Sequence, residues 1–379
     1  MKKICLALCV SLAAALALPT WGDVSPYIYK VYDFVPAPGQ FDNVYPEYED
    51  GDTYDDIIAK VEEQLCGDQK PGLISLGAYG GYVVFGFDHS IVNVAGEYDF
   101  KVYGNAFSGS AEPGIVMVMR DENGNGLPDD TWYELAGSEY NNADTKKNYE
   151  ITYYRPDEDK ERDPDPDYAY VNDRTYVLWT TNYEDEASGY VMRNIYHSQS
   201  YWPQWTEDTV LVFKGTRIPN NYTLNSGIYT LASYDWGYVD NQPNSTDTGF
   251  KIDWAVDSAG NSVSLSQIDF IKVYTALNQY CGWIGETSTE VCGGEDLHPD
   301  ESSVASAMAD GHWLRVSCSD GNLHVTLAGS GFEGCIYSAS GRLLLRVAVS
   351  EGVNAFDITA LPPGVYVLQS PMGGYKFVR

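Results

Sequence analysis

The stretch GGYVVFGF (80–87), followed by YDFKVYGNAF (98–107) and GIVMVMR (114–120), decides the fold class. These segments are rich in Val, Phe and Tyr, which strands favour, and Gly, Pro and Asn separate them. No helical run lies between them, whereas an alternating α/β fold needs crossover helices. The sequence therefore predicts an all-β main domain, a β-sandwich of the jelly-roll type.

The same pattern continues along the chain. One helix is expected at 55–65, where apolar residues recur at helical spacing: Ile57, Ile58, Val61 and Leu65. The stretch 155–168 has alternating charges and three prolines, so it is expected to be an exposed loop. Further strands are expected at NYEITYY, RTYVLWTT, TVLVFKG and IDFIKVYT, over 148–154, 174–181, 209–215 and 268–275.

The first residues, 1–22, have the features of a secretory signal peptide. Two lysines precede an apolar run from Ile4 to Leu18, and small residues follow it. The run is shorter than the ~20 residues of a membrane span, and no later segment is long and apolar enough to be one. We therefore expect a secreted chain without a transmembrane segment.

The composition is acidic and aromatic. The chain has 54 Asp and Glu against 23 Lys and Arg, a formal net charge of −31, with 31 Tyr and 9 Trp. Nucleic acid is excluded as a general partner, because no basic face exists to replace the counterions of phosphates. Divalent cations and neutral ligands remain compatible with this charge. Candidate disulfides join Cys281 to Cys292 and Cys318 to Cys335, with free thiols as the alternative.

A change of composition near the C-terminus marks a second domain. The segment 295–311 is small, polar and acidic, as expected of a linker. It separates a main domain at 23–294 from a C-terminal domain at 312–379. Seven short strands are expected in this last domain, which fits a small Ig-like β-sandwich.

Three motifs of the C-terminal domain carry a family resemblance. They are Gly341-Arg342, then LPPGVY at 361–366, then KFV at 376–378. In this order they resemble the type A C-terminal sorting domain of the type IX secretion system of Bacteroidetes. The resemblance implies a domain that the secretion and sorting machinery reads as an address, and a location on the exterior of the outer membrane. Gly364 is expected at positive φ, which ordinary hairpin chemistry would also explain.

The loop DENGNGLPDD (121–130) is the strongest chemical signal. Oxygen-bearing side chains stand at alternate positions, and a tight loop delivers alternate residues to one centre, as a hard cation such as Ca²⁺ requires. Trp132 stands where an EF-hand has its bidentate Glu, so Asp130 or Glu134 would supply that carboxylate. The alternative is an Asn-Gly turn without an ion. The candidate metal ligands are Asp121, Asn123, Asn125, Leu127, Asp129 and Asp130.

Two aromatic clusters are candidate ligand-binding surfaces. YHSQSYWPQW (196–205) lacks strand alternation, so its rings are expected on a loop, and SYDWGY (233–238) places alternate rings on one strand face. Such rings stack on sugars or on flat cofactors. The alternative is that they pack in the core. The candidate ligand-binding residues are Tyr201, Trp202, Trp205, Tyr234 and Trp236.

The main domain carries a second resemblance. The segments GGYVVFGFDHSIVNVAGEYDFKVYGNAF (80–107), TWYELAGSEY (131–140) and FIKVYTALNQYCGWIGETSTEV (270–291) resemble a group of uncharacterised cell-surface proteins of Bacteroidetes that occur beside PKD-type modules. The resemblance spans most of 25–297 and implies a surface location and a β fold. Some surface proteins of this kind accompany nutrient or vitamin uptake, which makes cobalamin one ligand option.

Catalytic motifs are weak. The histidines show no HExxH spacing, Asp88-His89 lacks a nucleophile motif, and Glu286 and Asp296 resemble solvated acids. We therefore expect a secreted, surface-displayed, calcium-stabilised protein that binds a glycan or another small polar nutrient. One alternative is a carbohydrate-active enzyme, a hydrolase or lyase using loop carboxylates. Another is a structural or adhesive surface protein without a small-molecule ligand.

Overall fold

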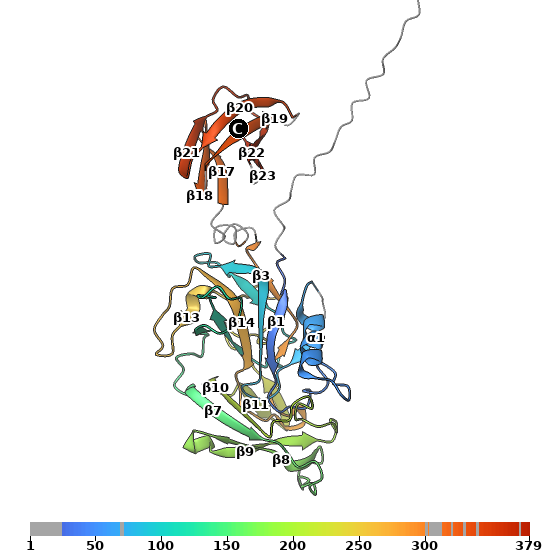
Figure 1. The fold of residues 1–379 in the computed structure, drawn as a ribbon. Helices are drawn as coiled ribbons and strands as arrows, with labels where there is room; N and C mark the ends of the chain where they lie inside the picture. The colour runs from blue at the N-terminus through green and yellow to red at the C-terminus, as the bar shows by residue number, and fades with distance from the viewer. Residues whose placement is uncertain are drawn as a thin grey trace, which may run out of the picture. The chain divides into compact units, whose positions relative to one another are not determined.

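The structure is a computed structural model, and it describes residues 25–68, 72–299, 302, 313–319, 321–328, 331–338, 341–370 and 373–379. The chain divides into two compact units, with the main unit at 24–303 and the C-terminal unit at 304–379. Strands dominate both units, and α1 is an α-helix of the main unit (Figure 1). The predicted all-β class is confirmed. The predicted signal peptide lies outside the described residues.

Two antiparallel sheets make up the body of the main unit. The larger, sheet I, has six strands in the order β1 (Lys30–Val35), β3 (Tyr82–Val92), β14 (Gln267–Thr275), β5 (Gly114–Met119), β6 (Trp132–Leu135) and β13 (Ala255–Val256). The smaller, sheet II, has the order β10 (Val210–Arg217), β7 (Lys146–Tyr154), β8 (Val171–Thr181) and β9 (Ser188–Asn194). Figure 1 shows β1, β3 and β14 side by side, with β7, β8 and β9 in a separate layer.

Strand alternation builds two cores, one on each face of sheet I. Along β14, Ile271 and Val273 join one core, and Tyr274 joins the other. This is the two-residue period of a strand buried on both faces. The second core lies between the sheets, where Tyr149 and Tyr153 of β7 are fully buried. The tyrosine-rich composition thus fills the middle of the sandwich.

The helix α1 (Tyr54–Leu65) covers the first core beside β1 (Figure 1). Thr53 and Asp56 form a reciprocal capping box, which satisfies two backbone donors that the first turn would leave unpaired. Ile57, Val61 and Leu65 are fully buried, as the spacing of the apolar residues predicted. The helix expected at 55–65 is therefore confirmed.

The main unit also contains short strand pairs. β2 (Ile74–Ser75) pairs with β15 (Glu290–Val291), β4 (Phe100–Val102) pairs with β16 (Gly294–Asp296), and β11 (Tyr222–Asn225) pairs with β12 (Ile228–Leu231). Because β16 contains residues 295 and 296, the main unit extends beyond the predicted start of the linker. Most of the predicted linker, from residue 300 on, lies outside the described residues.

A buried histidine ties β16 to the middle of β3. His89 is hydrogen bonded through Nδ1 to Asp88 at 2.6 Å and through Nε2 to Asp296 at 2.7 Å. Burial lowers the pKa of His89, but the hydrogen bonds and charges of Asp296 and Asp88 outweigh it, so the net pKa is raised. The arrangement is a structural clamp between two carboxylates.

The C-terminal unit has seven strands in two sheets around one small core. Gly341 takes a positive φ of 78°. Gly364 does not, contrary to the prediction, and its N–H and C=O pair with the C=O and N–H of Arg379. The strands are β17 (Trp313–Ser319), β18 (Asn322–Ala328), β19 (Phe332–Ser338), β20 (Leu343–Val349), β21 (Gly352–Asp357), β22 (Val365–Ser370) and β23 (Gly373–Val378).

Neither candidate disulfide is formed. Cys281 is a free thiol, and so are Cys318 and Cys335. Burial raises the pKa of the Cys281 thiol to about 12, so this side chain is a packing group. In the described part of the chain, no helix has the length and hydropathy to span a membrane.

Candidate functional site

Three loops far apart in the sequence meet where β5 begins. The N–H of Glu112 donates to the carbonyl of Asp240, and the N–H of Glu290 donates to Oδ2 of Asp240 at 3.1 Å. Gly104 allows this approach, because a Cβ there would lie 2.5 Å from Oδ1 of Asp240. The Thr289 hydroxyl then joins the third loop to the carbonyl of Glu112 at 2.9 Å.

The meeting point gathers three carboxylates. Glu112, Asp240 and Glu290 each offer one oxygen, and these oxygens all lie within 4.8 Å of one another. Asp240 is 3% exposed and Glu290 is 5% exposed, while Glu112 is partly buried. This carboxylate cluster could hold a metal ion.

Burial makes the charged forms of the cluster costly. It raises the pKa of Glu112 to about 8 and that of Asp240 to about 7. Burial, followed by the charges of Glu112 and Asp240, raises the pKa of Glu290 well above its ordinary value. Three adjacent acids in a low dielectric repel one another unless protons or a cation compensate them.

A second buried acidic pair lies beside the cluster. Glu286 accepts a hydrogen bond from the N–H of Gln40 at 2.6 Å through Oε1, but its Oε2 has no hydrogen-bond partner. Both carboxylate oxygens of Asp42 are also unpaired, although Asp42 is fully buried. Burial raises the pKa of Glu286 to about 7 and, together with the charge of Glu286, raises that of Asp42.

The carboxylates face a pocket of about 760 Å³, which we call the carboxylate pocket. Its wall includes Glu112, Glu286 and Glu290, and a set of aromatic side chains faces them. Several of these rings are largely exposed, at 65% for Phe107, 67% for Tyr196 and 56% for Trp283. The other aromatic residues of the wall are Phe41, His197 and Tyr229.

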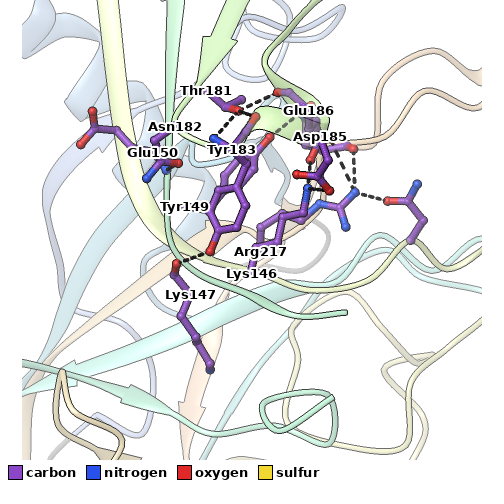
Figure 2. A network of polar contacts seen from close by, with 12 residues as sticks. Lys146, Lys147, Tyr149, Glu150, Thr181, Asn182, Tyr183, Asp185, Glu186 and Arg217 are labelled. Atoms are coloured by element: carbon purple, nitrogen blue, oxygen red, sulfur yellow. Dashed lines mark hydrogen bonds and ion pairs between the residues drawn. The ribbon is translucent and has the colours of Figure 1, made fainter. Parts of the chain in front are cut away.

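Two basic side chains of sheet II pair with other acids. Lys146 lies 3.0 Å from both Asp185 and Glu186, and Arg217 lies 3.7 Å from Glu186. Figure 2 shows this network, in which Lys146 and Arg217 converge on the acids of η1 (Glu184–Glu186). Among the ion pairs of the described residues, none involves the carboxylate cluster.

The predicted metal loop at 121–130 folds back on itself. Asp121 accepts hydrogen bonds from the N–H groups of Gly124, Asn125 and Gly126 at 2.7, 3.1 and 2.8 Å. The amides of Asn123 and Asn125 donate to Asp129, at 3.1 and 3.0 Å. Asp130 accepts from the N–H of Glu122, and Leu127 is 51% exposed. The loop thus brings its predicted oxygen ligands close together at the surface.

The predicted aromatic platform at 201–205 is wrong for its two main residues. Tyr201 and Trp202 are 0% and 1% exposed and belong to the core between the sheets. Trp202 donates from Nε1 to the carbonyl of Asp208 at 3.1 Å, so its polar edge is satisfied as well. Trp205 is partly buried and stacks on Phe34. The segment instead reaches the carboxylate pocket through Tyr196 and His197.

The second predicted cluster lies apart from the carboxylate pocket. Trp236 is 40% exposed, packs 4.5 Å from Trp254 and lines a separate pocket of about 250 Å³. Tyr234 is partly buried and its hydroxyl donates to the carbonyl of Pro219. Neither residue is among those that line the carboxylate pocket.

The residues that do form the site were mostly missed by sequence reasoning. Glu112, Asp240 and Glu290 are three acids among 54, and no spacing sets them apart. Glu286 was noted, but it was not separable from solvated acids.

Comparisons with known proteins identify no family. No family model matches the chain, and no curated protein matches it. Two solved structures are weakly similar, a β-glucuronidase from an uncultured Clostridium sp. and the BSP domain of a biofilm associated protein. The first is 8% identical with a TM-score of 0.16 over 94% of this chain, and the second is 9% identical with 0.15 over 86%. The chain spans 43% and 55% of their lengths, and these scores carry no argument about fold or function.

Proposed function

We propose that the protein is a secreted, surface-displayed binding protein whose carboxylate pocket holds a neutral glycan or another small polyhydroxyl nutrient. One observation carries this proposal: exposed aromatic rings and three carboxylates, two of them buried, line one pocket. Aromatic faces stack on the C–H faces of sugar rings, and carboxylate oxygens accept hydrogen bonds from hydroxyl groups. A pocket of about 760 Å³ is large enough for an oligosaccharide end group.

The charge of the pocket restricts the ligand. Glu112, Glu286 and Glu290 line it, and no Lys or Arg is among the described residues that do. An anionic ligand would bring like charges together in a site of low dielectric. The proposed ligands are therefore uncharged, and sulfated or uronic acid polymers are disfavoured. Cobalamin remains one option among larger polar nutrients.

The binding test compares two tryptophan substitutions. Trp283→Ala removes an exposed ring from the carboxylate pocket, and we expect at least about tenfold weaker binding to neutral glycans, since a lost stacking contact costs about 1.5 kcal/mol. Trp236→Ala, at the separate pocket, is the matched control and leaves binding unchanged. A glycan array followed by calorimetry measures both. Equal effects of the two substitutions would place the ligand elsewhere.

We propose in addition that the loop at 121–130 binds Ca²⁺ and stabilises the main unit. The support is the closeness of its oxygen-bearing side chains, whose amides now turn toward Asp129 and are free to turn their oxygens to an ion. Export by the type IX machinery through the C-terminal unit belongs to the same proposal. Calorimetry in Ca²⁺ and in chelator tests the loop: Asp121→Ala should reduce the calcium-induced rise in Tm.

A glycoside hydrolase is the second candidate function. The observation in its favour is the unpaired Oε2 of Glu286, a buried carboxyl group on the wall of the pocket. A general acid needs such an environment, with a second carboxyl group nearby as base or nucleophile. Incubation with a neutral glycan panel decides between the functions. Products that disappear in Glu286→Gln establish hydrolysis, whereas retained glycan without products establishes binding.

A further inference from the structure

The carboxylate cluster has the geometry of a cation site. Two oxygens on opposite sides of a Ca²⁺ ion, each about 2.4 Å from it, are about 4.8 Å apart. The oxygens of Glu112, Asp240 and Glu290 lie within this same 4.8 Å of one another. Their separations therefore do not exceed the span of one coordination sphere. The group contains carboxylates alone, which hard cations prefer, and has no His or Cys to favour a softer metal.

The protein offers the cluster hydrogen-bond donors but no positive charge. The N–H groups of Asn105 and Glu290 donate to Asp240, at 2.7 and 3.1 Å, and the N–H of Ser288 donates to Glu112 at 3.3 Å. These bonds hold the carboxylates in place. Lys146 and Arg217 are paired with the acids of η1 instead (Figure 2).

A separate observation also points to an absent positive partner. Glu286 is 5% exposed, lines the same pocket as Glu112 and Glu290, and keeps its Oε2 without any hydrogen-bond partner. Gln40 lines this pocket too and is 3% exposed. Its amide nitrogen donates to the carbonyl of Ile284 at 2.6 Å, which leaves Oε1 unpaired. Buried acceptors without donors are rare, and several in one pocket call for a ligand that supplies positive charge.

We propose that Glu112, Asp240 and Glu290 bind a hard divalent cation of the calcium class beside the carboxylate pocket, which Glu112 and Glu290 line. Asp240 is the anchor, since its carbonyl accepts from the N–H of Glu112 and its two side-chain oxygens accept from the N–H groups of Asn105 and Glu290. The ion ties the three loops together and remains open to the pocket through Glu112 and Glu290. Solvent or a ligand hydroxyl completes its coordination. The site is distinct from the loop at 121–130, and its test contains no glycan, so it stands independently of the proposed function.

The experiment isolates this site in the full-length protein. Asp121→Ala disables calcium binding by the loop at 121–130 and serves as the parent protein. Glu290→Gln is then introduced into this parent. After chelator treatment, each protein is titrated with Ca²⁺, Mg²⁺ and Mn²⁺ by calorimetry, and Tm is measured with and without each ion. Glu295→Gln in the same background is the matched control, a partly buried glutamate of β16 outside the cluster. Glu112→Gln, at the more exposed ligand, replaces Glu290→Gln if that protein does not fold.

The expected result is one equivalent of Ca²⁺ bound by Asp121→Ala and by its Glu295→Gln derivative. Glu290→Gln should weaken this binding at least about 100-fold, since loss of a ligand exceeds the effect of losing a ligand's supporting contact. It should also abolish most of the calcium-induced rise in Tm that the parent shows. A cluster that only shares protons gives no calcium response in Asp121→Ala. That result, or an unchanged response in Glu290→Gln, overturns the proposal.

Discussion

Replacing Trp202 by Ala should lower the stability of the main unit rather than abolish ligand binding. The indole is 1% exposed in the core between the two sheets, and its Nε1 donates to the carbonyl of Asp208. Truncation of a buried Trp costs about 3–5 kcal/mol, and the lost hydrogen bond places this substitution in the upper part of that range. The expected loss of about 4–5 kcal/mol is a large part of the ~5–15 kcal/mol that stabilises a typical domain.

Differential scanning calorimetry measures this loss. For a unit of this size, about 4–5 kcal/mol corresponds to a fall in Tm of about 10 °C or more. Trp236→Ala is the control of equal chemistry: its ring is 40% exposed, and the fall should be a few degrees at most. A transition of the C-terminal unit, if resolved, gives an internal reference that neither change moves. A Trp202→Ala protein with a normal Tm and weakened ligand binding would contradict the buried position of Trp202 and support its role in ligand binding.

Three further predictions concern local features. His89→Gln should destabilise the protein more at pH 5.5 than at pH 9, because the pKa of His89 is raised in the folded state. The stability that this raised pKa contributes is fully present below the unfolded-state pKa of ~6.5 and is lost as pH rises through the folded-state pKa. Urea unfolding at both pH values measures the difference. Gly77→Ala should cost about 2 kcal/mol more than Gly96→Ala: both glycines have positive φ, but a Cβ on Gly77 would lie 1.8 Å from the carbonyl oxygen of Ala37, and one on Gly96 meets nothing within 4 Å. Equal Tm values for the two would contradict the overlap. Thr53→Ala should cost about 1 kcal/mol through loss of the helix cap, and Thr53→Ser, which keeps the acceptor, should recover most of it in the same unfolding assay.

Local patterns were enough for the fold class. Successive side chains of a strand point to opposite faces, so a segment such as 268–275 can be predicted as a strand from its own sequence, before its partner strands are known. The helix expected at 55–65 was equally predictable, because its apolar residues recur at helical spacing within one short segment. The boundary at 295 was misplaced, since β16 is only three residues long and is defined by its pairing with β4.

The aromatic residues show where composition stops being informative. A stretch rich in Tyr and Trp fits a stacking surface and a tightly packed core equally well, because both use the large apolar area of the rings. Trp202 went to the core, whereas Tyr196, six residues earlier, is 67% exposed on the pocket wall. Which side of the loop faces the sheets depends on where sheet II packs, and the local sequence does not encode this.

The sequence by itself determined an acidic β-protein with a helix and an oxygen-rich surface loop, because each of these properties depends on residues that are neighbours along the chain. The carboxylate cluster was decided by tertiary structure alone. Asp240 and Glu290 are 50 residues apart, and Ser288, which orients Glu112, is 176 residues from it. Strand order and register bring these segments together. Burial then raises the pKa values of the three acids and makes their charged forms costly, an effect that is absent from the unfolded chain.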